Sequence, residues 1–297
     1  MLPSWNIIAY IYEDDHEFIS PFMMDLPHIS KMSEYTDMSA TIEYHSQMNI
    51  HGHYLITIRG GKISLKSIDP INAEEEKSIV TGMIELCKNY FRTDRRNIFL
   101  YGGHCYRQFI RPFRKNMSIE DWIEFLVKAN ITFDISVFDC CYTSEVKMLM
   151  NLSRVTKYYI GCQSASPYLG YFTADFVRIL NSKASIPSMI KKWIHSFIDR
   201  NNVAPRKLTF HTDGVGIDLR KFNKISGNLN LDAIKPRRTA RVEDGPEYKS
   251  LQDLQTLLKH NKMKNKIAGC IIHYQQSLRL QKRKKSVNMH GISIFIH

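Results

Sequence analysis

Two stretches of the sequence end an apolar run in side chains that do chemistry. In "ISVFDCCYTSEV" (residues 135–146), apolar residues lead to Asp139 and then to two cysteines, the second of which is Cys141. In "RRNIFLYGGHCY" (residues 95–106), another apolar run leads through two glycines to His104. A thiol attacks as its thiolate, and a neighbouring imidazole can take or hold the proton. The two stretches therefore predict a nucleophile and its base, if the fold brings both strand ends to one edge.

The hydrophobic pattern predicts a sheet that does this. Apolar runs rich in β-branched and aromatic residues predict strands at 5–12, 39–47, 97–103, 134–139 and 157–162. Amphipathic helices are expected at 118–130 and 142–152, and the pair Gly60-Gly61 predicts a hairpin within 53–68. This alternation favours an α/β fold with a mostly parallel sheet and helices on both faces. In such sheets the ligand site lies beyond the carboxyl ends of the strands.

The turn after the strand at 134–139 is expected to supply a further catalytic group. If the helix at 142–152 starts there, the backbone N–H of Cys141 points outward and can stabilise an oxyanion. Gly102 and Gly103 let the chain turn sharply and let a substrate approach the backbone. A second interpretation stays open from spacing alone. A cysteine at a strand end is usually a packing residue, and a histidine after two glycines is often a turn residue.

The second half of the sequence is less regular than the first. It predicts, in order, two helices within 170–200, a strand and a turn at 206–219, a polar loop at 223–247, a helix at 248–261, and strands at 268–277 and 291–297. No sharp composition boundary separates the halves. We therefore expect one domain over residues 1–297, in which 1–165 form the core and 166–297 complete it.

Composition narrows the class of protein. The chain has 297 residues, and 43% hydrophobic side chains suffice for a large core. Its six cysteines show no CxxC spacing, so we expect neither a zinc knuckle nor a disulfide framework, but reduced thiols. The amino terminus lacks a basic leader, and no apolar run is long enough to span a bilayer. These features predict a cytoplasmic, intracellular location and no membrane contact.

Several stretches, in the same order along the chain, resemble clostripain-like cysteine peptidases. "WNIIAYIYEDD" is similar to the opening strand of that family, and "IFLYGGHC" resembles its strand ending in Asp-His-Gly. "ISVFDCCYTSEV", "KYYIGCQSASPYLGYFTADF", "TFHTDGVGIDLRKF" and "HGISIFIH" resemble later family motifs. The positions that match in the first two of these are Asp139, Cys141, Glu145, Pro167, Gly170 and Tyr171.

The resemblance implies a caspase-like three-layer sandwich and a cysteine endopeptidase. Carried over by motif, Cys141 is the nucleophile and His104 is its base or proton donor. Asp139 would form a pocket for arginine or lysine at P1, because a carboxylate in a partly dry pocket selects cations well. The oxyanion donors would be the backbone N–H groups of Cys141 and Cys105. The expected partner is a peptide or protein with a basic P1 residue.

Processing and cofactors follow from the same resemblance. Family members are often cleaved between the histidine and the cysteine, and the loop at 106–117 contains Arg107, Arg111, Arg114 and Lys115. That loop is a candidate site of self-cleavage, and a solvated basic loop is the alternative. The resemblance allows a calcium ion, but no loop of regularly spaced oxygen ligands is present in the sequence. We therefore expect no cofactor and no metal.

Four departures from the family pattern keep a second function open. Cys105 replaces the glycine after the histidine, and Gly103 replaces the acid before it. The segment "CQSAS" (162–166) replaces a pair of acids, and Cys140 occupies an alanine position. A catalytically inactive caspase-like module that binds a peptide or protein is the alternative function.

A third class, the nucleic-acid-binding proteins, is suggested by charge alone. The formal net charge is +12, and basic runs occur at 235–241 and 279–285. Aromatic residues do not interleave with these runs, so no platform for stacking bases is predicted. The sequence therefore disfavours nucleic acid as a partner.

Overall fold

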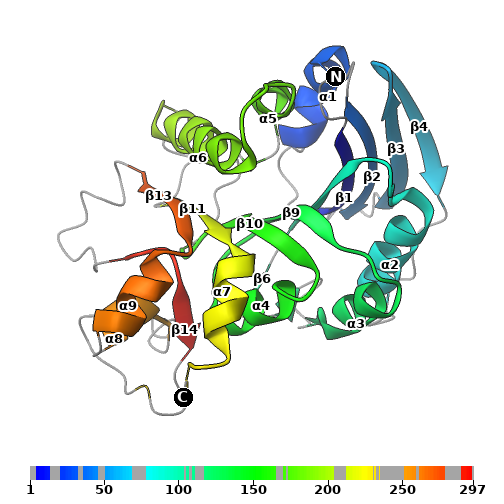
Figure 1. The fold of residues 1–297 in the computed structure, drawn as a ribbon. Helices are drawn as coiled ribbons and strands as arrows, with labels where there is room; N and C mark the ends of the chain where they lie inside the picture. Colours follow the sequence, from blue (N-terminus) through cyan, green and yellow to red (C-terminus); the bar gives the residue numbers. More distant parts are fainter. Residues whose placement is uncertain are drawn as a thin grey trace.

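The computed structural model describes most of the chain. The described residues are 5–13, 21–32, 36–45, 51–68, 78–103, 105–106, 109–110, 117–164, 170–171, 173–203, 212–229, 231, 234, 251–258, 261–277 and 289–295. They form one large sheet between two layers of helices (Figure 1). None of the helices in this part of the chain is long and apolar enough to cross a membrane.

The middle layer is a nine-stranded sheet with the order β13-β11-β10-β9-β5-β1-β2-β3-β4. Its strands are β1 (Trp5–Glu13), β2 (Thr36–His45), β3 (His51–Arg59), β4 (Lys62–Ile68), β5 (Arg96–Gly102), β9 (Phe133–Asp139), β10 (Thr156–Gly161), β11 (Asp213–Asp218) and β13 (Ile271–Gln276). The five central strands β10, β9, β5, β1 and β2 are parallel to one another. Antiparallel strands extend the sheet at both edges. The predicted mostly parallel sheet is therefore confirmed for the centre.

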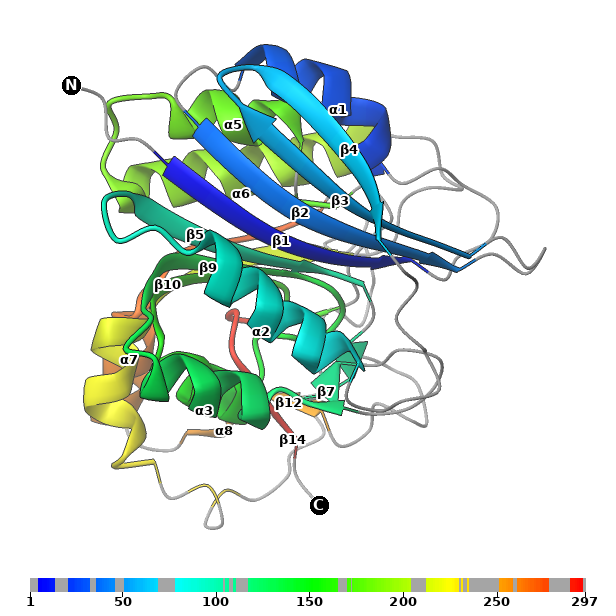
Figure 2. The same cartoon turned by 90° about the vertical axis from the view of Figure 1, so that its right-hand side faces the viewer.

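Helices cover both faces of the sheet. One face carries α1 (Pro21–Met32), α5 (Ala174–Leu180) and α6 (Ile186–Val203), drawn above the sheet in Figure 2. The other face carries α2 (Ser78–Tyr90), α3 (Glu120–Lys128), α4 (Val146–Leu152), α7 (Leu219–Ser226), α8 (Leu254–Leu257) and α9 (Asn261–Ala268). This is the three-layer α/β sandwich that the resemblance implied.

The strand pattern explains why both faces are apolar. In β1, Ile7 and Ala9 pack into the core beneath α5 and α6, whereas Ile8 and Tyr10 pack into the opposite core. Side chains of a strand alternate between the two faces, so a continuous apolar run serves two cores at once. The absence of polar alternation in the central strands is therefore the signature of a sheet covered on both sides.

Several local predictions need correction. The segment 106–117, expected to be a loop, overlaps β6 (Cys105–Tyr106), β7 (Phe109–Ile110) and β8 (Met117–Ser118), which form a small antiparallel sheet. The helix expected at 248–261 is divided into β12 (Leu251–Asp253) and α8, and β12 pairs with β14 (Ser293–Phe295). The hairpin prediction is confirmed, because Gly60 and Gly61 both have positive φ values, 51° and 76°.

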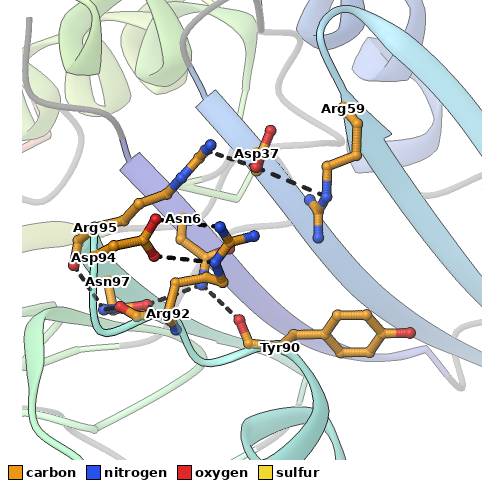
Figure 3. A network of polar contacts seen from close by, with 8 residues as sticks. All are labelled: Asn6, Asp37, Arg59, Tyr90, Arg92, Asp94, Arg95 and Asn97. Atoms are coloured by element: carbon orange, nitrogen blue, oxygen red, sulfur yellow. Dashed lines mark hydrogen bonds and ion pairs between the residues drawn. The ribbon is translucent and has the colours of Figure 1, made fainter.

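A network of polar contacts lies at the end of the sheet where β1 and β5 begin (Figure 3). Asn6 is fully buried, and its Nδ2 donates to Tyr90 O at 2.8 Å and to Asn97 Oδ1 at 2.9 Å. Asn97 Nδ2 in turn donates to the carbonyls of Arg92 and Arg95 at 2.6 and 2.9 Å. These bonds fix the α2–β5 turn at the edge opposite the predicted site.

Candidate active site

The two chemically active stretches do follow neighbouring strands. β5 and β9 are parallel, and the last residue of each, Gly102 and Asp139, are register partners. The contact continues past the strand, because Gly103 N donates to Asp139 O at 3.3 Å. Adjacent strands lie about 4.8 Å apart, so the chain leaves the sheet at two neighbouring points. His104 lies outside the described residues, and its distance from Cys141 stays a prediction.

Gly103 is required by its surroundings. Its φ is +149°, and an added Cβ would lie 3.0 Å from both the Tyr101 hydroxyl and the Tyr12 carbonyl. An L-residue would be strained there and would displace two packed tyrosines. The glycine in place of the family's acid therefore suits this backbone, which has no space for a carboxylate at that position.

Cys141 differs in exposure from the other cysteines that form no disulfide in the described part of the chain. Its side chain is half-buried, whereas those of Cys87, Cys162 and Cys270 are buried. Burial raises the pKa of Cys87 to about 12 and that of Cys270 to about 11, and it raises the pKa of Cys162 well above the ordinary value. These three thiols are therefore poor nucleophiles, and the accessible one is the residue that the sequence selected.

Cys140, beside it, is buried and disulfide-bonded. This corrects the expectation of uniformly reduced cysteines. Sequence spacing could not reveal the bond, because cysteines that are distant along the chain meet only through the fold.

Backbone hydrogen bonds hold the turn that carries Cys141 against the segment after β10. Tyr142 N donates to Ser164 O, and Ser144 N donates to Cys162 O, both at 3.0 Å. The Cys162 thiol donates to Cys140 O at 3.1 Å. Tyr142 has a φ of 60°, which is uncommon for a bulky side chain and persists only where the surroundings impose it. The turn is therefore a constrained structure.

The turn does not open a helix directly, as the sequence had suggested. α4 begins at Val146, and Glu145 is its N-cap, accepting from Lys147 N at 2.9 Å and Met148 N at 3.1 Å. The predicted oxyanion donor at Cys141 would therefore be a turn N–H and not a helix N-terminus. The second predicted donor, the backbone of Cys105, lies at the start of β6.

A buried carboxylate, Asp213, anchors the segment that supports the turn. Asp213 opens β11 and is fully buried. Its Oδ2 accepts from Gln163 N at 3.1 Å, and its Oδ1 accepts from Ser164 N at 2.8 Å and from the Ser164 hydroxyl. A carboxylate that accepts several N–H and O–H bonds can remain charged in an apolar environment.

The side chain of Gln163 connects this anchor to the end of the chain. Its Nε2 donates to Asp253 Oδ2 and its Oε1 accepts from Gly291 N, both at 2.9 Å. Asp253 is fully buried and also binds His290, accepting from the backbone N at 2.8 Å and lying 2.9 Å from Nδ1. The residues of this network come from β11, β12 and the segments after β10 and before β14, and sequence reasoning did not select Asp213, Asp253 or His290.

Asp139 lies beside the segment 170–171. Its Oδ2 accepts from Tyr171 N at 2.5 Å, and a Cβ on Gly170 would collide with the same oxygen. The carbonyl of Gly170 accepts from Arg200 Nη2 at 2.9 Å. The carboxylate predicted to select substrates is thus partly engaged by the protein, and the matching Gly170 is needed to let the backbone approach it.

No metal centre is indicated within the described ranges. There, no group of three or more His, Cys, Asp or Glu side chains could hold a metal ion. The family's calcium therefore receives no support from these residues, and the prediction of no cofactor stays untested.

Comparison with solved structures defines the fold. A secreted C11 cysteine protease from Bacteroides thetaiotaomicron is similar with a TM-score of 0.72 and 13% identity, over 99% of this chain and 94% of that chain. A second structure, described as a secreted C11 cysteine protease from the same organism in complex with an irreversible peptide inhibitor, has a TM-score of 0.72 and 14% identity. The match covers 99% of this chain and 93% of that chain. An inactive zymogen C11 protease from Parabacteroides distasonis is similar with a TM-score of 0.68 and 14% identity, over 100% of this chain and 92% of that chain. No protein-family model and no curated protein matches the sequence. The chain has the caspase-like fold of the clostripain-like proteases along nearly its whole length.

We predict that Asp213→Asn destabilises the fold and loosens the turn that carries Cys141. The amide keeps one acceptor but places an N–H₂ group against backbone donors, so the free energy of unfolding should fall by about 3 kcal/mol. Urea denaturation measures this, and Asp199→Asn on the exposed side of α6 is the matched control. Equal stability of the two variants would show that Asp213 does not anchor the segment.

Proposed function

We propose that the chain is a cysteine endopeptidase that cleaves after arginine or lysine. Cys141 is the nucleophile, and His104 is the base that takes or holds its proton. The backbone N–H groups of Cys141 and Cys105 stabilise the oxyanion. In the first step sulfur adds to the scissile carbonyl, the C–N bond breaks as the thiol proton reaches the leaving amine through the imidazole, and the acyl group remains on sulfur as a thioester. Water then hydrolyses the thioester.

One observation carries the proposal: the half-buried thiol of Cys141 lies at the carboxyl edge of a sheet with the C11 protease fold. Cys141 follows β9, and the strand beside β9 leads to His104. Ligand sites of such sheets lie at this edge. The similar protein from Bacteroides thetaiotaomicron is described with an irreversible peptide inhibitor, which supports a peptide as the ligand class.

The P1 preference is proposed from Asp139. This carboxylate is half-buried immediately before the nucleophile turn, so a cationic side chain could reach it in a partly dry pocket. Its bond to Tyr171 N uses one oxygen and fixes the orientation of the group.

A catalytically inactive module that binds a peptide is the second candidate. The observation that favours it is that the carboxylate of Asp139 already has a protein partner in Tyr171 N. The similar protein from Parabacteroides distasonis is described as an inactive zymogen, so this fold also occurs in an inactive form.

Fluorogenic peptides separate the two candidates. Peptides with arginine or lysine at P1 should be hydrolysed by the wild type, and Cys141→Ala should reduce kcat/KM by roughly 10⁴-fold or more. Asp139→Asn should lower kcat/KM for these peptides about tenfold more than for a peptide with alanine at P1. Cys270→Ala, a buried thiol away from the turn, is the control and should retain activity. Identical background rates for wild type and Cys141→Ala would favour the inactive module.

We also propose that the protein cleaves itself within 106–117. Of this segment, Arg107, Arg111, Arg114 and Lys115 lie outside the described residues. Intact-mass spectrometry of purified wild type, after reduction of its disulfides, should show two fragments divided after one of these basic residues, whereas Cys141→Ala should remain a single chain. Fragmentation of both proteins alike would point to a contaminating protease and contradict self-processing.

Two observations do not support the predicted cytoplasmic location. The disulfide at Cys140 does not support the predicted reducing cytoplasm, and the similar protein from Bacteroides thetaiotaomicron is described as secreted. Hydrolysis should therefore be measured with and without a mild reductant.

A further inference from the structure

Asp139 and Arg200 lie on opposite sides of one peptide group. Arg200 is in the last turn of α6, and its Nη2 donates to the carbonyl of Gly170. The N–H of the same peptide unit, that of Tyr171, donates to Asp139. A guanidinium, a peptide group and a carboxylate thus form a continuous chain of charge-assisted hydrogen bonds, each of which polarises the next.

The residues packed around these hydrogen bonds fix their geometry. Tyr171 is fully buried, its ring stacks on Phe197 with centroids 3.9 Å apart, and its carbonyl accepts from Trp193 Nε1 at 2.8 Å. Gly170 has no Cβ to push the carboxylate of Asp139 away. Because Phe197 and Trp193 are on α6 with Arg200, the helix holds both the peptide group and the cation.

Arg200 is a partly buried cation. Its Nε is buried and finds no hydrogen-bond partner among the residues that the structure describes. Burial lowers the pKa of Arg200, and Asp139 is the strongest of the influences that oppose this shift, followed by Asp175 and Asp25. The carboxylate of Asp175 is already bonded to Arg178 and Ser196, at 2.9 and 3.0 Å. Asp139 is therefore the chief electrostatic partner of Arg200.

We propose that Arg200 is a specificity-determining residue, which holds Asp139 through the 170–171 peptide and offsets part of its negative charge. The inference rests on the proposed function, because Asp139 must face the P1 side chain. A substrate cation then meets a carboxylate whose charge is already shared with an internal guanidinium. The internal cation limits how strongly the pocket prefers a charged P1 residue over a neutral one of the same shape.

Arginine and citrulline at P1 test this directly, since they share their shape and differ in charge. In Arg200→Met the ratio of kcat/KM for the arginine peptide to that for the citrulline peptide should rise about tenfold over wild type. Arg200→Lys keeps the charge and a donor, so it should restore the wild-type ratio. Arg154→Met, which removes a surface arginine paired with Glu124, is the matched control and should leave the ratio unchanged. Any loss of folded protein cancels in the ratio.

Binding measurements keep the inference separate from the proposed function. Fluorescent arginine and citrulline peptides are titrated into Cys141→Ala and into the double variant with Arg200→Met, and the ratio of Kd values is compared. A tenfold gain in preference for arginine without hydrolysis by wild type would support the role of Arg200 and contradict the endopeptidase. An unchanged or smaller ratio in Arg200→Met, by kinetics or by binding, would overturn the role of Arg200. Peptides that neither bind nor are cleaved would overturn both.

Discussion

The carboxyl edge of the sheet depends on one buried carboxylate. Asp213 is fully buried in the apolar sandwich, where its carboxylate oxygens accept bonds from the backbone N–H groups of Gln163 and Ser164. Those two residues are thereby fixed, and their neighbours supply the carbonyls that hold the turn of Cys141. The bonds from two adjacent backbone N–H groups, those of Gln163 and Ser164, to the Asp213 carboxylate thus fix the loop after β10. That loop in turn supports the turn of the proposed nucleophile.

The same edge shows how the rest of the site is assembled from distant parts of the chain. The parallel register of β5 with β9 makes Gly102 and Asp139 neighbours, which places the two active stretches side by side. From the other side, α6 holds the 170–171 segment against Asp139. The turn of Cys141 and the carboxylate of Asp139, proposed as nucleophile and specificity group, are therefore positioned by separate networks, one from β11 and one from α6.

The sequence predicted what short-range patterns encode. Apolar runs identified the central strands, because a strand buried on both faces needs no polar alternation, and the strand ends identified Asp139 and Cys141. It could not predict Asp213 or Arg200, which act on residues far away along the chain. The start of α4 was also misplaced, because Glu145 caps the helix and leaves the preceding residues to form a turn. The pairing of β12 with β14 depends on a contact between separate segments, and a helical pattern obscured it.

The most direct measurement of the central claim is the site of covalent labelling by a peptidyl electrophile with lysine at P1. The account predicts that mass mapping finds the label on Cys141 and that excess arginine peptide prevents labelling. It also predicts that an analogue with glutamate at P1 labels poorly, while the buried thiols of Cys87, Cys162 and Cys270 stay unmodified. Equal labelling by the lysine and glutamate reagents, or a label on another cysteine, would contradict a thiol nucleophile beside a cation-selecting carboxylate.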